Sequence, residues 1–306
     1  MKKFLVKASL FFILTLLTLS FILMNFGGYV DPFYEKFTVP KQTSMILGDS
    51  RSLQGIQPRI IDAELKDSGY DLPMFNYSFT IAQAHYGKPY TESVRKKLKT
   101  SKNGLFILSV HPWLFAEGKN EKLKSGKYPE TDVPPHNMLF TNKNPNFEYF
   151  VRNYKFFNFR NLFRSSGTLH KDGWMEESNF PKDSVDMVWW KNRQIKRYEL
   201  FPKEMNKSPQ RISDFIAMIT DLKKNGRIIL VRMPVDPAFL KIETSFWGNF
   251  DDEIGTLSKK MGLEYFDFSK SDKYRTYDGN HLDKYVGAVF TKDLCDSIKT
   301  TAQPQP

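Results

Sequence analysis

Residues 44–58 read "SMILGDSRSLQGIQP". The stretch opens with an apolar run, residues 45–47, and then changes at once to Gly-Asp-Ser-Arg, residues 48–51. The apolar run predicts a buried strand, and the small and polar residues after it predict that the strand ends there. Two interpretations follow. The stretch is either an ordinary exit from strand to loop, because turns favour Gly, Asp and Ser, or a device that holds a serine hydroxyl at the end of a strand as a nucleophile.

The rest of the chain alternates apolar runs with stretches of helical spacing. Five strands are predicted, over residues 43–47, 74–79, 105–110, 227–234 and 264–269. Helical stretches separate or follow them, over residues 58–69, 84–104, 210–226, 252–262 and 284–301. This alternation predicts an α/β fold with three α/β/α layers around a five-stranded parallel sheet. In such folds the chemistry lies at the carboxyl ends of the strands, which is where Ser50 falls.

Residues 115–208 separate the third predicted strand from the fourth, and they are too many for a single crossover helix. Two parts of this segment are crowded with aromatic residues, 146–163 and 185–201. We therefore predict a helical, aromatic-rich insertion that forms a cap beside the sheet. Its aromatic side chains are either ordinary cap core or a substrate groove or membrane-facing patch. Interleaved cations suit anionic lipid or glycan, namely Arg152, Lys155, Arg160 and Arg164.

The N-terminus combines three lysines with a long apolar run. Lys2, Lys3 and Lys7 precede residues 8–24, which as a helix span roughly 25 Å at 1.5 Å per residue. That length is close to what a membrane crossing needs, and lysines flanking such a run stay in the cytoplasm. We expect a single-pass anchor in the bacterial inner membrane, with the remaining chain periplasmic or otherwise extracytoplasmic. The alternative is a cleaved signal peptide.

These patterns together divide the chain. Residues 1–26 are expected to be the transmembrane anchor and residues 27–42 a linker. Residues 43–300 are expected to form the α/β domain, interrupted by the insertion or cap at 115–208, and residues 301–306 a disordered tail.

The charge and cysteine content exclude several classes of protein. Lysine and arginine number 45 against 34 acidic residues, and a net charge of +11 favours anionic partners. The apolar N-terminus argues against nucleic acid as that partner and favours lipid headgroups or anionic envelope polymers. The single cysteine, Cys295, excludes an internal disulfide framework and a multi-cysteine metal site. The sequence indicates no metal and no organic cofactor.

A serine nucleophile needs a base to take its proton, and the base needs an orienting acceptor. Of the five histidines, His281 stands in "YDGNHLDKYVGAVF", after the fifth predicted strand and before the last helix. Asp278 lies three residues earlier. This spacing on a loop lets the aspartate bond one ring nitrogen while the other faces Ser50. Both loops belong to the same rim of the predicted sheet.

Gly48-Asp49-Ser50 near the start, Asp278-x-x-His281 near the end and five α/β units between them resemble the SGNH (GDSL-type) hydrolase superfamily, with its flavodoxin-like sheet. The resemblance covers the sheet-forming parts, about two-thirds of the chain, and not the insertion. It implies that Ser50 is the nucleophile, that His281 is the general base and acid, and that Asp278 orients the histidine.

Two family blocks depart from the pattern. The second block of the family offers a glycine N–H to the oxyanion, but here the stretch "FNYSFTIAQ" contains Asn76 and Ser78 and no glycine. The third block offers an asparagine, which "SVHPWLF" lacks. The expected oxyanion donors are therefore the N–H groups of Ser50 and Ser78 and the side chain of Asn76. Asn76 has the alternative role of a plain turn residue.

Two further polar residues lie near the predicted rim. Arg51 is either a surface or rim cation, or it faces the pocket and holds a carboxylate or phosphate of the substrate. His111, at the end of the third predicted strand, is either a loop histidine bonded to backbone or part of the lining of the site.

The anchor together with "GDSRS", "SVHPW", "RMPV" and "DGNHLD" is most similar to membrane-anchored SGNH-like proteins of the bacterial envelope. Several such branches move acyl groups on surface polymers alongside membrane-bound O-acyltransferases. The resemblance implies serine-dependent acyl transfer, by an esterase or deacetylase or by an O-acyltransferase, on an acylated cell-surface polysaccharide or similar polymer. A membrane-bound O-acyltransferase is the implied partner. The alternative is a non-catalytic envelope protein of the same fold that binds a glycan or such an acyltransferase.

Overall fold

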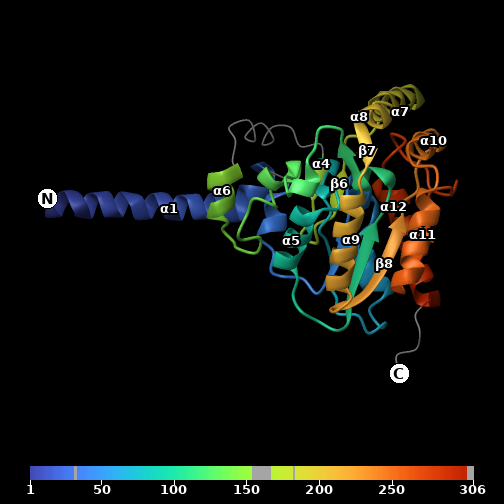
Figure 1. Cartoon of the computed structure of the whole chain (residues 1–306). Helices are drawn as coiled ribbons and strands as arrows, with labels where there is room; N and C mark the ends of the chain where they lie inside the picture. Colours follow the sequence, from blue (N-terminus) through green and yellow to red (C-terminus); the bar gives the residue numbers. More distant parts are fainter. Residues whose placement is uncertain (31–32, 154–166, 182, 302–306) are drawn as a thin grey trace.

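The computed structural model describes residues 1–30, 33–153, 167–181 and 183–301, and its centre is a parallel sheet (Figure 1). The strand order in this sheet is β2-β1-β3-β8-β9, and every neighbouring pair is parallel. The five strands are β1 (Ser44–Leu47), β2 (Met74–Asn76), β3 (Gly104–Ser109), β8 (Gly226–Arg232) and β9 (Glu264–Asp267). The predicted five-stranded parallel sheet is confirmed.

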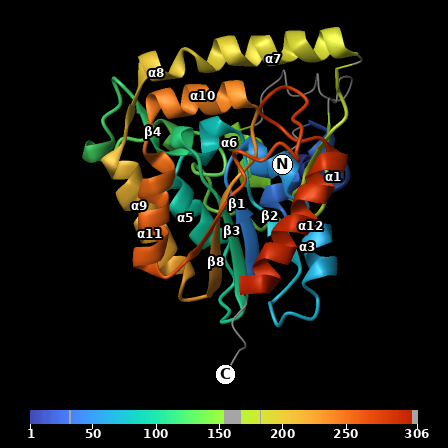
Figure 2. The same ribbon diagram turned by 90° about the vertical axis from the view of Figure 1, so that its right-hand side faces the viewer.

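Helices cover both faces of the sheet, because successive residues of each strand point to opposite sides. Met45 and Leu47 join one core cluster, whereas Ile46 between them joins the other. The first face is covered by α5 (Lys88–Lys97), α9 (Pro209–Leu222) and α11 (Phe250–Met261). The second face is covered by α3 (Pro58–Glu64) and α12 (Lys284–Thr301), as Figure 2 shows. The three-layer α/β/α architecture is therefore also confirmed.

Some elements differ from the sequence-based expectation. The strand β2 ends at Asn76 and not at residue 79, because the Asn76 Oδ1 accepts a local hydrogen bond from the Ser78 N–H at 3.0 Å. The helices that were not predicted include α2 (Ser50–Gly55), the short α4 (Ile81–Ala84) and α10 (Pro237–Phe246). Two of them begin directly after an aspartate whose carboxylate accepts from the first turn, Asp49 for α2 and Asp236 for α10.

The insertion between β3 and α9 is aromatic-rich and helical, as predicted, in the part that the structure describes. Its helices are η2 (Pro112–Phe115), η3 (Leu123–Ser125), η4 (Pro129–Asp132), α6 (Phe147–Asn153), α7 (Ser184–Tyr198) and α8 (Phe201–Glu204). It also forms two antiparallel pairs that were not predicted, β4 (Ala116–Gly118) with β7 (Met205–Lys207) and β5 (Gly167–Leu169) with β6 (Met175–Glu177). Trp113 packs against Tyr198, Phe201 and Phe246, which is ordinary aromatic core. Lys155, Arg160 and Arg164 lie outside the described residues.

The N-terminal helix α1 (Lys2–Val30) is long and apolar enough, by length and composition, to cross a membrane. It leads to η1 (Tyr34–Phe37), which is bound to the domain. The buried Lys36 ammonium donates to the carbonyl oxygens of Asn76 and Ser78, at 2.7 and 2.6 Å. Through this contact the segment after α1 is tied to the end of β2. The compartment that the domain faces stays a prediction.

Candidate active site

Ser50 stands at the start of α2, directly after the tight turn that ends β1. Gly48 makes this turn possible, because its φ is +145° and a Cβ there would lie 2.6 Å from the Ser52 Oγ. Asp49 then caps the helix by accepting a hydrogen bond from the Arg51 N–H at 3.1 Å. The turn leaves Ser50 half-buried at the carboxyl edge of the sheet.

The loop between β9 and α12 is folded on itself and carries the histidine. The Tyr277 N–H donates to the His281 carbonyl oxygen at 3.0 Å. The Asp278 Oδ1 accepts from the N–H groups of Asn280 and His281, at 2.9 and 2.8 Å. Gly279 has a φ of +88°, a conformation that favours glycine. These local bonds fix the direction of both the aspartate and the histidine side chains.

The structure brings the three residues of the sequence prediction into one chain of hydrogen bonds. The His281 Nε2 lies 2.8 Å from the Ser50 Oγ, and the His281 Nδ1 lies 2.8 Å from the Asp278 Oδ2. Burial of Asp278 would raise its pKa, but the neighbouring His281 and the hydrogen bonds to the carboxylate lower it overall. An ionised Asp278 keeps the proton on Nδ1, so that Nε2 faces the serine as an acceptor.

The helix α7 of the insertion covers this edge of the sheet (Figure 2). The Gln194 Nε2 donates to the Asp278 Oδ2 at 3.3 Å, and the Lys191 ammonium pairs with Asp236 at 2.5 Å. A cavity of about 510 Å³ lies beside the covered loop. Its lining includes Met187 of α7, Leu240 of α10, and Tyr274, Tyr277 and Gly279 of the loop that carries His281.

Arg51 is a buried structural residue, and the expectation of a surface or rim cation was wrong. Only 1% of its surface is exposed. Its Nη2 donates to the Glu243 Oε1 at 2.6 Å, and the Glu243 Oε2 pairs with Arg232 at 2.8 Å. Burial would raise the pKa of Glu243, but Arg232 and Arg51 lower it to about 2. With its charge engaged inside the protein, the Arg51 guanidinium is not positioned to hold an anionic substrate group.

Asn76 and Ser78 do not supply the expected oxyanion donors, because their donor groups are already engaged. The Asn76 Nδ2 donates to the carbonyl oxygens of Ser52 and Ile56, at 2.9 and 3.1 Å. The Ser78 N–H donates to the Asn76 Oδ1, and both residues are fully buried. Their hydrogen bonds hold the end of β2 against α2, beneath the serine.

His111 also supports the turn below the serine and does not line the site. Its Nε2 lies 2.9 Å from the Asp49 Oδ2, and both side chains are buried. Burial would raise the pKa of Asp49, but His111 and Arg51 lower it overall. The pair anchors the cap of α2 to the end of β3, so the interpretation of His111 as a pocket residue was wrong.

Asn280, like Gln194, is a polar residue of the site that the sequence interpretation missed. Its Nδ2 lies 3.2 Å from the His281 Nε2 and 3.2 Å from the Tyr198 Oη. The Arg51 Nε donates to the Asn280 Oδ1 at 2.8 Å, which fixes the amide with its NH₂ group toward the histidine. The residue was visible in "DGNH", but its direction depends on Arg51, which lies 229 positions away in the chain.

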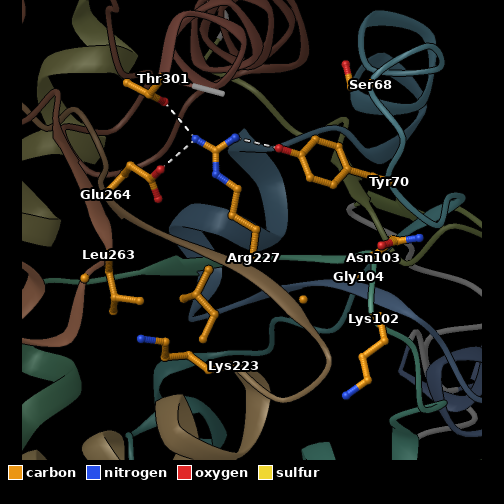
Figure 3. A pocket seen from close by; sticks show the side chains of 13 residues that line it. Ser68, Tyr70, Lys102, Asn103, Gly104, Lys223, Arg227, Leu263, Glu264 and Thr301 are labelled. Carbon is orange, nitrogen blue, oxygen red and sulfur yellow. Dashed lines mark hydrogen bonds and ion pairs between the residues drawn. The ribbon is translucent and has the colours of Figure 1, made fainter. Parts of the chain in front are cut away.

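The opposite edge of the sheet carries a hollow of a different kind, of about 440 Å³ (Figure 3). Arg227 is held there by Tyr70, Glu264 and Thr301, at 2.5, 2.8 and 2.8 Å. No histidine is among the described residues that line it. Across the described part of the chain, no group of three or more His, Cys, Asp and Glu side chains forms a set of metal ligands.

No protein-family model and no curated protein matches this chain. Among solved structures, the chain is similar to a protein of Agrobacterium tumefaciens str. C58 that is described as a "putative arylesterase". The two share 12% identity over 85% of this chain and 100% of that chain, with a TM-score of 0.33. A likeness this distant carries no argument about activity, so the interpretation of the site depends on its own geometry.

Proposed function

We propose that this chain is a serine-dependent esterase or O-acyltransferase of the SGNH type, working through an acyl-enzyme at Ser50. The observation that carries the proposal is the continuous hydrogen-bond chain from the Ser50 Oγ through the His281 ring to the Asp278 carboxylate. Nucleophile, base and orienting acid in this order are the arrangement that acyl transfer by serine requires.

In the first half-reaction, the Ser50 Oγ attacks the carbonyl carbon of an ester. Its proton passes to the His281 Nε2, while the Asp278 Oδ2 holds the Nδ1–H and stabilises the imidazolium. The tetrahedral intermediate then collapses, the bond from carbon to the alcohol oxygen breaks, and Nε2 returns the proton to the leaving alcohol. The acyl group remains as an ester on Ser50.

In the second half-reaction, a hydroxyl group accepts the acyl group from Ser50. The His281 Nε2 takes the proton of the incoming hydroxyl, and the Ser50 Oγ leaves with that proton when the second intermediate collapses. Water as the acceptor makes the protein an esterase or deacetylase, and a sugar hydroxyl makes it an O-acyltransferase.

We propose that the substrate is an acylated envelope polysaccharide or similar polymer. The domain then lies outside the inner membrane, beside a membrane-bound O-acyltransferase.

Two groups are available to stabilise the oxyanion. The Ser50 N–H belongs to the first turn of α2, where N–H groups have no acceptor within the helix. The Asn280 Nδ2–H points to the His281 Nε2 while that atom is an acceptor. Once Nε2 has taken the serine proton it becomes a donor, and the Asn280 N–H then needs another acceptor nearby. We propose that the developing oxyanion on the carbon bonded to Ser50 is that acceptor.

The test is covalent labelling of the full chain in detergent with a fluorophosphonate. We expect the wild-type chain to be labelled and Ser50→Ala to be inert. Ser245→Ala, which removes an exposed serine of α10, is the matched control and should label normally. Undiminished labelling of Ser50→Ala, or a folded wild-type chain that the reagent never labels, would overturn the proposal.

The choice between water and a sugar hydroxyl has its own measurement. With p-nitrophenyl acetate as donor, an esterase releases acetate whether or not a soluble oligosaccharide is present. An O-acyltransferase forms acetylated oligosaccharide, which mass spectrometry detects, and its acyl-enzyme persists without an acceptor. In Ser50→Ala neither product should form.

A further inference from the structure

The end of α1 packs against the domain and is not a free stalk. Leu23 is only 3% exposed and belongs to the same core cluster as the sheet, and Leu19 packs against that cluster. Gly27 approaches the Tyr34 ring so closely that a Cβ would lie 2.2 Å from it. The domain therefore begins to touch α1 several residues before the helix ends.

The length of the apolar run leaves no spacer between a bilayer and this contact. Residues 8–24 span roughly 25 Å as a helix, whereas the hydrocarbon core of a bilayer is about 30 Å thick. Leu19 lies five residues before the end of this run, about 7 Å along the helix axis. If α1 crosses a membrane, the part of the domain that contacts Leu19 and Leu23 must lie at the depth of the headgroups.

The part of the domain beside α1 exposes a group of large apolar side chains, which we name the collar: Leu139 (66% exposed), Phe140 (49%), Phe147 (37%) and Val151 (81%). Phe147 and Val151 share one face of α6, being four residues apart. The Glu148 carboxylate accepts from the N–H groups of Leu139 and Phe140, both at 2.8 Å, and so holds them against α6.

The collar is fixed to the segment that follows α1. The Asn146 N–H donates to the Tyr34 Oη at 2.9 Å, and the rings of Tyr34 and Tyr149 meet edge to face at 5.4 Å. Figure 1 shows α6 directly beside the end of α1. Two cations flank the collar, Lys143 above the Phe140 ring and Arg152 beside Glu148. Exposed apolar side chains bordered by cations match the boundary between acyl chains and anionic headgroups.

We propose that the collar inserts into the headgroup–acyl boundary of the same bilayer that α1 crosses. The domain is then seated on the lipid by two attachments, α1 and the collar. In Figure 1 the axis of α1 crosses the direction of β8. With α1 along the bilayer normal, the strands lie parallel to the membrane surface. The edge of the sheet that carries Ser50 then faces sideways, neither toward the bilayer nor away from it. The proposal depends on membrane insertion of α1 and not on the proposed chemistry.

The experiment places an environment-sensitive nitrobenzoxadiazole label at single cysteines in the full chain. The chain is reconstituted in vesicles of phosphatidylethanolamine and phosphatidylglycerol, and quenching by nitroxide-labelled lipids is measured. Val151→Cys and Phe140→Cys report on the collar, and Leu14→Cys reports on insertion of α1. Val188→Cys on α7 is the matched control, being 58% exposed and distant from α1 (Figure 1). The native Cys295 is buried, and the unsubstituted chain measures any label that it takes up.

We expect the labels at residues 14, 140 and 151 to be quenched by the lipids and shifted to shorter emission wavelength, and the label at 188 to remain water-like. If the label at residue 14 is quenched but the labels at 140 and 151 emit as in water, α1 crosses the bilayer and the collar does not insert. That result overturns the proposal. If the labels at 140 and 151 emit at shorter wavelength but are not quenched by the lipids, a protein surface covers these residues. That result also overturns the proposal. Absence of quenching at 14 removes the membrane premise and the proposal with it. None of these outcomes depends on activity at Ser50.

Discussion

The two edges of the sheet both carry an arginine paired with a glutamate, but only one of these edges carries the serine that we propose as the nucleophile. At the carboxyl edge, Arg51 bonds Glu243 and Asn280, and Asn280 touches the His281 Nε2. At the amino edge, Arg227 bonds Glu264, Tyr70 and Thr301, near the end of α12. Both edges also carry a hollow of similar size. A hollow and a charged pair therefore do not identify the site; a serine within hydrogen-bonding distance of an oriented histidine does.

The largest expected difference between the two edges is in catalysis. Asp278→Asn should lower kcat for an ester substrate by about 10⁴-fold, because the amide no longer enforces the tautomer in which Nε2 accepts. Arg227→Gln, at the amino edge, should leave kcat unchanged. Steady-state hydrolysis of p-nitrophenyl acetate by both variants measures the contrast. Equal rates for the two variants would remove the distinction between the edges.

The next effect is on stability, and it compares the two arginines directly. Arg51→Met should lower the free energy of unfolding by about 3–5 kcal/mol, because it leaves Glu243 buried with one cation fewer. Arg227→Met should cost only about 1 kcal/mol, since its pair with Glu264 is partly exposed, at 19% and 32%. Urea unfolding of the full chain in detergent, followed by circular dichroism, measures both. Similar losses would mean that burial does not distinguish the pairs.

A smaller effect on kcat tests Asn280 as an oxyanion donor. Asn280→Ala should lower kcat about 10²- to 10³-fold with little change in KM, because the proposed hydrogen bond from Asn280 to the oxyanion forms only in the transition state. Asn103→Ala, an exposed amide at the amino edge, is the control and should behave as wild type. A raised KM with unchanged kcat would instead assign Asn280 to ground-state binding.

The smallest effect is a pH dependence of stability from Glu243. Its pKa is about 2 in the folded chain against an ordinary 4.5, so the unfolded chain binds more protons between these values. Stability from this group is fully present above about pH 5 and is lost as the pH falls toward 2, by about 3 kcal/mol in total. Unfolding measured at pH 6, 4 and 3 should show this loss, and Glu243→Gln should flatten it. An unchanged slope in the variant would assign the acid sensitivity to other carboxylates.

The fold was predictable because its signals are local. The strands β1 and β3 are short apolar runs that are fully buried. A continuous apolar run of this length is typical of a strand covered on both faces of a sheet. The helix α10 was missed because it follows closely on the fourth strand, although Asp236 and Pro237 carry a helix-start signal, an aspartate cap followed by proline in the first turn. The pairs β4/β7 and β5/β6 are only three residues per strand, too short for a period to show.

The site was predictable only in part, for a related reason. Asp278 and His281 are three residues apart, and their placement after the last strand matched that of Ser50 after the first. Arg51 looked like a surface cation because lysine and arginine are mostly exposed. Its burial depends on its ion pair with Glu243, which lies 192 positions away in the chain. No local sequence pattern around Arg51 predicts that partner.

The sequence by itself determined the alternation of strands and helices, the apolar N-terminal helix and the three residues whose side chains meet at the carboxyl edge. Those features follow from periodicity, turn chemistry and the rule that parallel strands end at one rim. Only the tertiary structure decided that Arg51 is internal, that the Asn76 amide donates to backbone carbonyl oxygens while the Ser78 N–H donates to the Asn76 Oδ1, and that Asn280 faces the histidine. Each of these depends on which distant group satisfies a buried charge or N–H, and that is settled only when the chain is folded.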